Sequence, residues 1–394
     1  FIIDVPDEME GDTLSRAVNS FGTSVVAVVA GAAGRRLGKV HIHTDSPQAV
    51  FDKARSLSRS KSLVKEKAED MLLQLELADC RDFALANAPR KVAVLGSSGM
   101  SLPAELPPAL TPTLANLLFM VDDETYEGND DITPQEFTDI MRREPNAMYT
   151  TSAARMGDYL KKIRELLNEA EEVLLVSLPF QISAGTKTAI DGALAQLDEA
   201  QRQRVFVWDA LAICANLGVL TAKAVKYSSQ GLSASEIIEK LEHMRQESGF
   251  WVCPPNIDLG IKSGRIPQTP ALKCLNSLRL LAVATGVRVP TIAEARASSN
   301  AKAERLKLAA VGCGARDKVV AKLRKQMLSV VPKDTPVGFT LQHTGRPDQL
   351  AGMIDFIKAN FTVKYMLLSY LDPPSLISMG PGTIAVGWFV HTED

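Results

Sequence analysis

The chain reads Leu175-Val176-Ser177-Leu178-Pro179-Phe180-Gln181-Ile182-Ser183-Ala184-Gly185-Thr186, and this stretch indicates the fold. An apolar, β-branched strand runs into a turn of small residues and continues as a helix. In a doubly wound α/β sheet, ligands bind beyond the carboxyl ends of the strands, where such turns lie. The stretch therefore predicts either a ligand-binding turn or ordinary capping of a helix that follows a strand.

The same alternation extends on both sides and predicts an α/β protein with mainly parallel sheets flanked by helices. Strands are expected at 91–95, 115–121, 173–177 and 205–208, and helices at 154–167, 186–197 and 218–228. A second block has expected strands near 280–283, 337–342, 364–368 and 383–390. These two blocks predict two lobes, at 91–277 and 278–394.

A small α/β unit is expected at 1–80. Alternating and β-branched patterns predict strands at 24–30 and 39–43 with a hairpin loop between them. Ser46 and Pro47 then begin a helix, and a charged helix follows at 64–77. The polar, Ala-rich segment 81–90 is the expected linker to the first lobe.

Bulk composition excludes several classes of protein. A formal charge of −2 gives no general attraction to nucleic acid or to an anionic membrane. No apolar stretch approaches the roughly 20 residues that span a bilayer. The five cysteines are scattered and form no CxxC pair, so neither a disulfide framework nor a zinc ribbon is expected, and a reducing cytoplasm is the predicted location.

Catalytic signatures are absent from the sequence. It contains neither a GxxxxGK[ST] phosphate loop nor a GxSxG nucleophile turn. His243, His343 and His391 have no evident nucleophile beside them. No catalytic residue is therefore predicted, and a binding role is favoured over an enzymatic one.

Hydroxyl side chains cluster at Thr150, Thr151 and Ser152, just before the helix expected from Ala154. Hydroxyls and free backbone N–H groups at a helix start can bind an anion at the positive end of the helix dipole. Simple N-capping is the competing interpretation, because Ser and Thr cap helices in many proteins.

Two further turns are candidates for function. The segment 261–266 places Lys262 and Arg265 around a glycine, which is usually only solvated charge. The segment 379–383 combines two glycines with a proline, and it would bring backbone close to a ligand or to another loop.

The order of these motifs over 91–394 resembles the DegV family, the fatty-acid-binding proteins that partner bacterial fatty acid kinase. The resemblance is carried by segments 97–103, 123–126, 132–137, 150–152, 182–183, 208–210, 262–266 and 379–383. It implies an acyl chain in an apolar tunnel between two α/β lobes. Hydroxyl groups would hold the fatty acid carboxylate, because burying that charge without donors is costly.

The resemblance assigns the fatty-acid-binding set residue by residue. The expected members are Thr150, Thr151, Ser152, Ser183 and Ser378. Lys262 and Arg265 would form rim charges for docking a kinase. Three departures imply altered headgroup chemistry: Gly96 stands where the family has an acidic residue, Pro179 and Phe180 where it has paired serines, and Ser378 where it usually has histidine.

Residues 1–80 resemble the middle domain of fatty acid kinase, through segments 39–47 and 69–74. The chain starts without Met, so a DhaL-type kinase domain is expected upstream. His41 and His43 alternate on one strand face, so both imidazoles would reach one zinc ion with a third ligand from elsewhere. The resemblance implies such a metal, but its usual cysteine would precede Phe1, and an empty site is the alternative.

Three functions follow as hypotheses. The leading one is a cytoplasmic fatty-acid-binding protein that presents its ligand to a DhaL-type kinase domain. The alternative is part of an ATP-dependent fatty acid or dihydroxyacetone-like kinase in which the DegV region is structural or regulatory. The third is an assembly role in which the first unit forms a homodimer.

Overall fold

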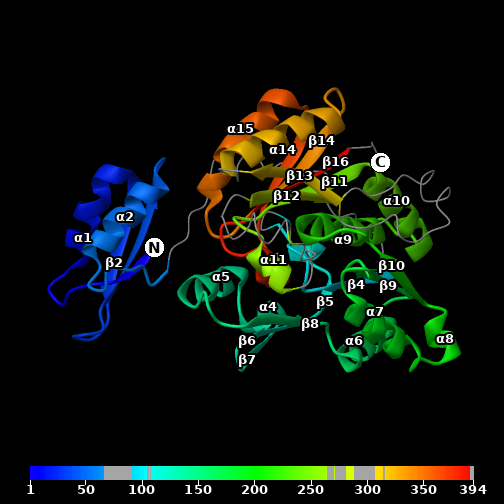
Figure 1. The fold of residues 1–394 in the computed structure, drawn as a ribbon. Coiled ribbons are helices and arrows are strands. Elements are labelled where there is room, and N and C mark those ends of the chain that lie inside the picture. The colour runs from blue at the N-terminus through cyan, green and yellow to red at the C-terminus, as the bar shows by residue number, and fades with distance from the viewer. Residues whose placement is uncertain are drawn as a thin grey trace. The chain divides into compact units, whose positions relative to one another are not determined.

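This computed structural model describes residues 1–65, 91–103, 106, 108–263, 270, 281–287, 307–313 and 316–390. The chain forms two compact units, Phe1–Asp70 and Met71–Asp394 (Figure 1). Most of the helix expected at 64–77 and all of the linker expected at 81–90 lie outside the described residues. Among the described residues, no helix combines the length and apolar character needed to cross a membrane.

The first unit is a three-stranded antiparallel sheet covered by helices on one face. Its strands are β1 (Ile2–Asp4), β2 (Thr23–Ala30) and β3 (Leu37–His43), in the order β1-β3-β2. Helices α1 (Gly11–Val18) and α2 (Pro47–Leu57) bury Leu14, Val18 and Ala54 against Ile3 and Val40. The expected strands at 24–30 and 39–43 are confirmed. Their alternating residues leave Val26 and Val28 exposed on the other face.

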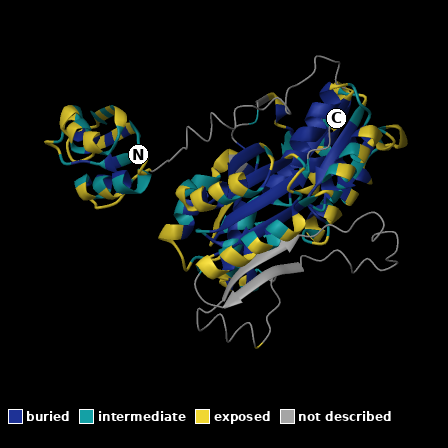
Figure 2. Ribbon diagram, turned by 90° about the horizontal axis from the view of Figure 1, so that it is seen from above, coloured by how far each residue is buried: buried dark blue, intermediate teal, exposed yellow. Residues whose placement is uncertain are grey.

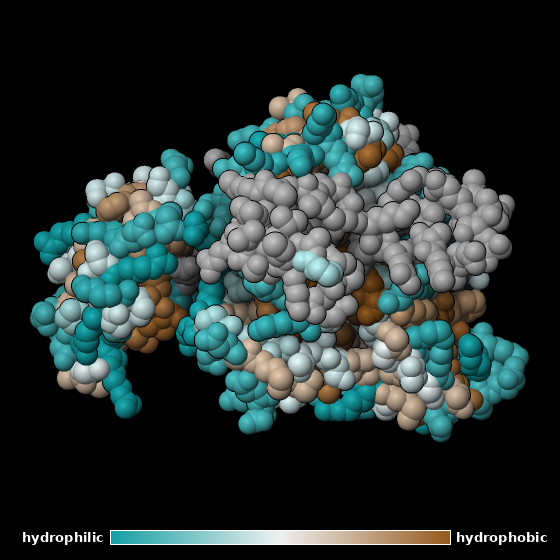
Figure 3. Space-filling view, in the orientation of Figure 1, coloured by the Kyte–Doolittle hydropathy of each residue, from teal (hydrophilic) through white to brown (hydrophobic). Residues whose placement is uncertain are grey.

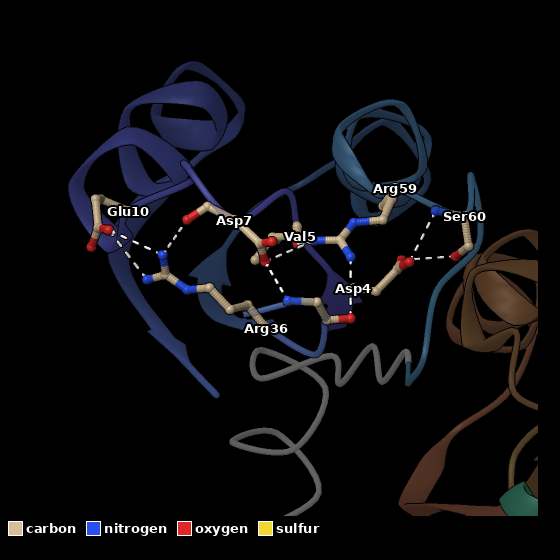
Figure 4. Close-up of polar contacts among 8 residues, drawn as sticks. Asp4, Val5, Asp7, Glu10, Arg36, Arg59 and Ser60 are labelled. Carbon is tan, nitrogen blue, oxygen red and sulfur yellow. Dashed lines mark hydrogen bonds and ion pairs between the residues drawn. The ribbon is translucent and has the colours of Figure 1, made fainter. Parts of the chain in front are cut away.

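Polar contacts join the loops of this unit (Figure 4). The guanidinium of Arg59 donates to the carbonyls of Val5 and Gly34 and to Asp7 Oδ1, at 2.7, 3.2 and 3.1 Å. Arg36 forms an ion pair with Glu10 at 3.2 Å. Arg59 therefore connects the segment after α2 to β1 and to the β2–β3 hairpin loop.

The second unit contains a four-stranded parallel sheet in the order β10-β9-β4-β5. Its strands are β4 (Val92–Ser97), β5 (Thr113–Ala115), β9 (Glu172–Ser177) and β10 (Val205–Asp209). Helices α6 (Met156–Glu169) and α7 (Ala184–Leu194) pack on one face, and α9 (Cys214–Ser229) and α10 (Ala234–Gln246) pack on the other. The short helix α8 (Glu199–Arg202) precedes β10. This sheet confirms the α/β prediction.

A small antiparallel sheet follows β5, in the order β7-β6-β8. It contains β6 (Leu118–Val121), β7 (Glu124–Glu127) and β8 (Tyr149–Ser152), with helices α4 (Gly128–Asp131) and α5 (Pro134–Arg143) between β7 and β8. The hydroxyl cluster lies just before a helix, as expected, but it forms a strand and does not cap that helix. Its backbone groups pair with β6, and α6 begins later, after Arg155, without a side-chain cap.

A six-stranded sheet completes the second unit, in the order β13-β12-β11-β16-β14-β15. Its strands are β11 (Ser248–Cys253), β12 (Leu281–Val287), β13 (Lys307–Cys313), β14 (Val337–His343), β15 (Val363–Tyr370) and β16 (Ile384–Val390). Only β14 and β15 pair in parallel in this sheet as described, which differs from a mainly parallel arrangement. β16 returns between β11 and β14 and runs antiparallel to both, and β12 runs antiparallel to both β11 and β13. β11 belongs to this sheet, although it lies within the segment 91–277 that was expected to form the first lobe.

Helices α14 (Arg316–Val330) and α15 (Ala351–Asn360) cover the outer face of the six-stranded sheet. Every residue of α9 is buried, because this helix lies between the two large sheets (Figure 1). Figure 2 shows buried strands and helices, in dark blue, through the interior of the second unit. Two short helices, α11 (Asp258–Lys262) and α16 (Pro373–Met379), lie against each other. Single 3₁₀ turns occur at Asn19–Phe21, Pro108–Leu110 and Pro347–Leu350.

Candidate functional site

A cavity of about 390 Å³ opens beyond the carboxyl ends of β4 and β9. Its walls come from the segment after β4, from β8, from the turn between β9 and α7, and from α16. The apolar lining residues are Leu117, Leu178, Ile182, Ile213, Pro374 and Met379, with Gly99, Ala153, Ala184 and Gly185. Figure 3 shows hydrophobic atoms in a hollow at the level of β4 and β5. The position agrees with the ligand crevice of parallel α/β sheets.

Hydroxyl groups from three separate elements line this cavity. Thr151 and Ser152 come from β8, Ser183 precedes α7, and Ser378 lies on α16. The structure thus brings four of the five expected fatty-acid-binding residues to one place. Thr150 is not among the lining residues and is exposed to solvent. That these residues bind a ligand stays a prediction.

The turn before α7 is stabilised by its own backbone. The carbonyl of Pro179 accepts hydrogen bonds from the N–H groups of Ile182 and Ser183, at 2.9 and 3.0 Å. Ser183 Oγ lies 2.7 Å from Thr186 Oγ1. One hydroxyl of this pair donates to the other. The second hydroxyl therefore keeps its own proton and can donate it to a ligand in the cavity.

The end of β4 carries no acidic side chain. A Cβ atom at Gly96 would lie 2.4 Å from Met100 Cε and 3.4 Å from the side chain of Thr221. Met100, which is buried, therefore fills the space that a longer residue at position 96 would need. This geometry accounts for the departure from the family pattern at Gly96.

A polar cluster that the sequence did not predict lies behind the α16 wall. Ser375 faces the cavity, and its Oγ lies 3.1 Å from Sγ of Cys214. The carboxyl group of Asp372 caps α16 by accepting from the N–H of Ser375 at 2.9 Å and from Ser101 Oγ at 2.8 Å. The sequence Asp372-Pro373-Pro374-Ser375 predicts the start of a helix. It does not indicate that a cavity lies beside that helix.

Burial changes the acidity of this cluster. Burial raises the pKa of Asp372, and hydrogen bonds from Ser375 and Ser101 partly oppose this. The pKa of the Cys214 thiol is well above its usual value, mainly through burial and then through the nearby Asp372 charge. A thiol of this kind is a poor nucleophile, because only the thiolate attacks.

The closing glycine turn holds α16 in place. Gly380 and Gly382 have φ values of +82° and +92°, which other residues rarely adopt. The N–H of Gly382 donates to Thr344 Oγ1 at 2.7 Å, and that of Gly380 to the carbonyl of Leu376 at 2.7 Å. The turn thus fixes the end of α16 beside the end of β14, which agrees with the expected close approach of two loops.

The expected kinase-docking rim is only partly described. Lys262 is exposed at the end of α11, whereas Arg265 lies outside the described residues. Their docking role therefore stays a prediction.

The expected zinc ligands share one face of β3. The ring centroids of His41 and His43 are 5.0 Å apart. A structural zinc ion needs four ligands, and among the described residues no group of three His, Cys, Asp or Glu side chains is placed to hold a metal. The described residues thus supply two ligands of the expected set and do not complete it.

Neither His243 nor His343 is among the residues that line the cavity. His243 is exposed on α10, and His391 lies outside the described residues. His343 ends β14 and is buried, and its Nδ1 accepts from the N–H of Gly345 at 3.0 Å. Burial lowers its pKa to about 4, with Asp348 raising it and Arg142 lowering it further.

Comparison with protein families gives two matches along the chain. Residues 91–391 match the model described as an uncharacterised protein of the DegV family. Residues 1–77 match the middle domain of FakA-like fatty acid kinase proteins.

Curated relatives match smaller or larger parts of the chain. A DegV domain-containing protein of Staphylococcus aureus (strain N315) is 28% identical over 156 residues, 40% of this chain and 53% of the relative. That match therefore spans about half the relative's length. One from Halalkalibacterium halodurans is 20% identical over 303 residues, 76% of this chain and 99% of the relative.

Solved structures share the fold. A DegV family protein from Thermus thermophilus, described by its fatty acid binding, aligns with a TM-score of 0.62 and 20% identity, covering 76% of this chain and all of that one. DegV from Bacillus subtilis, described as a fatty acid binding protein, aligns with a TM-score of 0.61 and 19% identity, covering 77% of this chain and all of that one. A stearic-acid-binding protein from Eubacterium ventriosum aligns with a TM-score of 0.62 and 16% identity, covering 76% of this chain and 98% of that one.

Proposed function

Because the chain belongs to the DegV family over residues 91–391, we propose that it binds a fatty acid and presents the carboxyl group for phosphorylation by a DhaL-type kinase domain. The acyl chain occupies the apolar part of the cavity. The hydroxyls of Thr151, Ser152 and Ser183 donate to the headgroup.

The single observation that carries this proposal is the composition of the cavity. Apolar side chains form most of the lining, and hydroxyls from β8, from the turn before α7 and from α16 converge on it. Small-molecule sites generally combine an apolar lining with a few polar groups that fix orientation. A long apolar chain with one polar end matches this division.

The relatives support the choice of ligand class. Structures with this fold from Thermus thermophilus, Bacillus subtilis and Eubacterium ventriosum are described as binding fatty acids. Neutral hydroxyl donors would hold a carboxyl group without neutralising it, which leaves its oxygens able to receive a phosphoryl group.

The match of residues 1–77 to a fatty acid kinase middle domain supports the kinase half of the proposal. A kinase domain in the same chain would meet the bound acyl group at high effective concentration. Lys262 and Arg265 would contribute positive charge at the docking rim, where charges mainly affect the rate of encounter.

The first test is denaturing extraction of the purified protein followed by mass spectrometry. The proposal expects a fatty acid in about one-to-one ratio with the protein, or stoichiometric loading when common fatty acids are supplied. Failure of both would contradict the acyl-binding half of the proposal. Formation of acyl phosphate from ATP and fatty acid by this chain alone would instead favour the alternative of an ATP-dependent kinase.

The double variant Thr151→Ala, Ser183→Ala should reduce the affinity for hexadecanoic acid by at least about 100-fold. Each lost hydrogen bond to a charged group removes roughly 1.5–3 kcal/mol. Binding is measured by equilibrium dialysis of the radiolabelled acid. Thr150→Ala is the matched control, because Thr150 lies on the same strand but does not line the cavity. Equal affinity of the double variant and the control would contradict the assigned site.

A further inference from the structure

Ser183 precedes α7 at the N-cap position, yet its side chain does not cap the helix. A serine at this position ordinarily accepts a hydrogen bond from a backbone N–H of the first turn. Here the N–H of Thr186 donates instead to the carbonyl of Ser183 at 3.1 Å, and Ser183 Oγ lies 2.7 Å from Thr186 Oγ1. The Ser183 hydroxyl is therefore paired with another hydroxyl and not with the helix backbone.

Thr186 is fully buried, whereas Ser183 is half-buried on the cavity wall. Among the described residues, Ser183 Oγ is the only hydrogen-bond partner of Thr186 Oγ1. If Ser183 donated to Thr186, the buried Thr186 proton would have no acceptor among those residues, and an unpaired polar group in the interior is costly. If Thr186 donates, both protons are used, because the Ser183 proton can reach a ligand or water in the cavity. This comparison assigns the donor role in the pair to Thr186.

The direction of this hydrogen bond decides what Ser183 offers to a ligand. With Thr186 as the donor of the pair, Ser183 directs its own proton into the cavity. An ionised carboxylate only accepts hydrogen bonds, and the bonds that it accepts are stronger than those of a neutral acceptor. Successive hydroxyls also polarise one another, so the Thr186 hydroxyl strengthens the hydrogen bond that Ser183 donates.

We propose that Thr186 is a positioning residue, which holds the Ser183 hydroxyl as a donor and thereby favours an ionised carboxylate over a neutral headgroup. Thr186 is not among the residues that line the cavity, so it acts through Ser183 and not through contact with the ligand. The inference rests on the proposed function and adds what selects the headgroup of its ligand. A purely structural role of Thr186 in the packing of α7 predicts instead that its variants affect every ligand alike.

The test compares two ligands with the same chain, hexadecanoic acid and the neutral hexadecan-1-ol, by equilibrium dialysis at about pH 8, where the free acid is ionised. Thr186→Val removes the hydroxyl and nearly keeps the shape of the side chain. It should lower the affinity for the acid about fivefold, which is the effect of one ordinary hydrogen bond. The affinity for the alcohol should change by less than about twofold, because hydrogen bonds to a neutral acceptor are weaker. Thr186→Ser keeps the hydroxyl, and as the matched control it should bind both ligands as the unmodified protein does.

Ser183→Ala supplies a second test, because an effect that passes through the Ser183 hydroxyl must disappear when that hydroxyl is absent. In this background, Thr186→Val should leave the affinity for hexadecanoic acid unchanged. Thr186→Ala also lacks the hydroxyl and has a smaller side chain, and it should reproduce the results of the valine variant in both backgrounds. The midpoint of urea unfolding verifies that each variant is folded.

Three results would each overturn the inference. The first is an unchanged affinity of the Thr186→Val variant for the acid, and the second is an equal loss of affinity for the acid and for the alcohol. The third is a loss that persists in the Ser183→Ala background. Failure of the unmodified protein to bind the acid would instead overturn the proposed function, so the two failures are distinguishable.

Discussion

At the scale of the residue, neighbouring hydroxyls of one strand differ in whether they reach the cavity. Thr150 and Thr151 are adjacent and chemically identical, yet only Thr151 lines the cavity. Ser152 lines the cavity as well, at the end of β8 and beside the lining residue Ala153, so the cavity meets the carboxyl end of this strand. The family resemblance assigned both to the site, because a sequence motif does not show which side chain of a segment faces a cavity.

His343 links protonation to the stability of the second unit. Burial lowers its pKa from the ordinary 6.5 to about 4. The unfolded chain therefore binds a proton between these pH values while the folded chain does not, so the free energy of unfolding falls as the pH falls from about 6.5 to about 4. The full effect is about 3 kcal/mol, since one pKa unit corresponds to about 1.4 kcal/mol.

Replacing His343 with Gln should remove most of this fall in the free energy of unfolding between about pH 6.5 and about pH 4, that is, most of its slope against pH. Urea unfolding followed by tryptophan fluorescence at several pH values measures it, and the slope is compared between the variant and the unmodified protein. His243→Gln is the control and should leave the slope unchanged, because His243 is exposed. The assignment is wrong if the slopes of the His343 variant and the unmodified protein coincide.

At the scale of the element, β16 and α9 meet at a site without room for a side chain. A Cβ atom at Gly387 would lie 1.8 Å from Asn216 Oδ1 and 2.4 Å from Thr340 Oγ1. Asn216 accepts from Thr340 Oγ1 at 3.1 Å and donates to the carbonyl of Gly249 at 3.1 Å. Glycine in β16 thus allows the buried helix to hydrogen-bond to the sheet beside it.

Gly387→Ala should lower the free energy of unfolding by about 3 kcal/mol, because overfilling a packed core moves side chains and breaks the Asn216 contacts. Gly157→Ala is the matched control. Gly157 lies in α6 with nothing within 4 Å of an added Cβ, so the change should stabilise by about 0.5–1 kcal/mol. The midpoint of urea unfolding is measured for each of the two variants. Equal midpoints would contradict the packing argument.

At the scale of the whole molecule, the cavity is assembled from segments far apart in the chain. Gly99, Ser183 and Ser375 come from the beginning, middle and end of the second unit. The three tryptophans, Trp208, Trp251 and Trp388, all lie in this unit as well. Their fluorescence therefore reports the folding of the part that contains the cavity.

Saturation with hexadecanoic acid should stabilise the second unit. A ligand at 100 times its dissociation constant adds about 2.7 kcal/mol when it binds only the folded state. Tryptophan fluorescence during urea unfolding should show a higher midpoint with ligand than without. The Thr151→Ala, Ser183→Ala variant should show no ligand-dependent shift. A shift of equal size in that variant would place the ligand elsewhere.

Local sequence patterns were enough to predict many of the strands and helices of the fold. Apolar and β-branched runs identified β4, β9, β10, β14, β15 and β16, and helix signals identified α2, α6, α7 and α9. The order of the turns was enough to indicate the DegV family. These features depend on residues close together in the chain, so the sequence alone determined them.

Only the tertiary structure decided the pairing of strands and the surroundings of buried polar groups. β8 is a strand because β6 lies beside it, and the β16 strand becomes antiparallel to its neighbours by returning between β11 and β14. Asp372 meets Ser101 across 271 positions and caps α16, which forms one wall of the cavity. The sequence supplied the hydroxyls and the apolar runs, but the acidity of Asp372 depends on burial by distant segments, which no local pattern encodes.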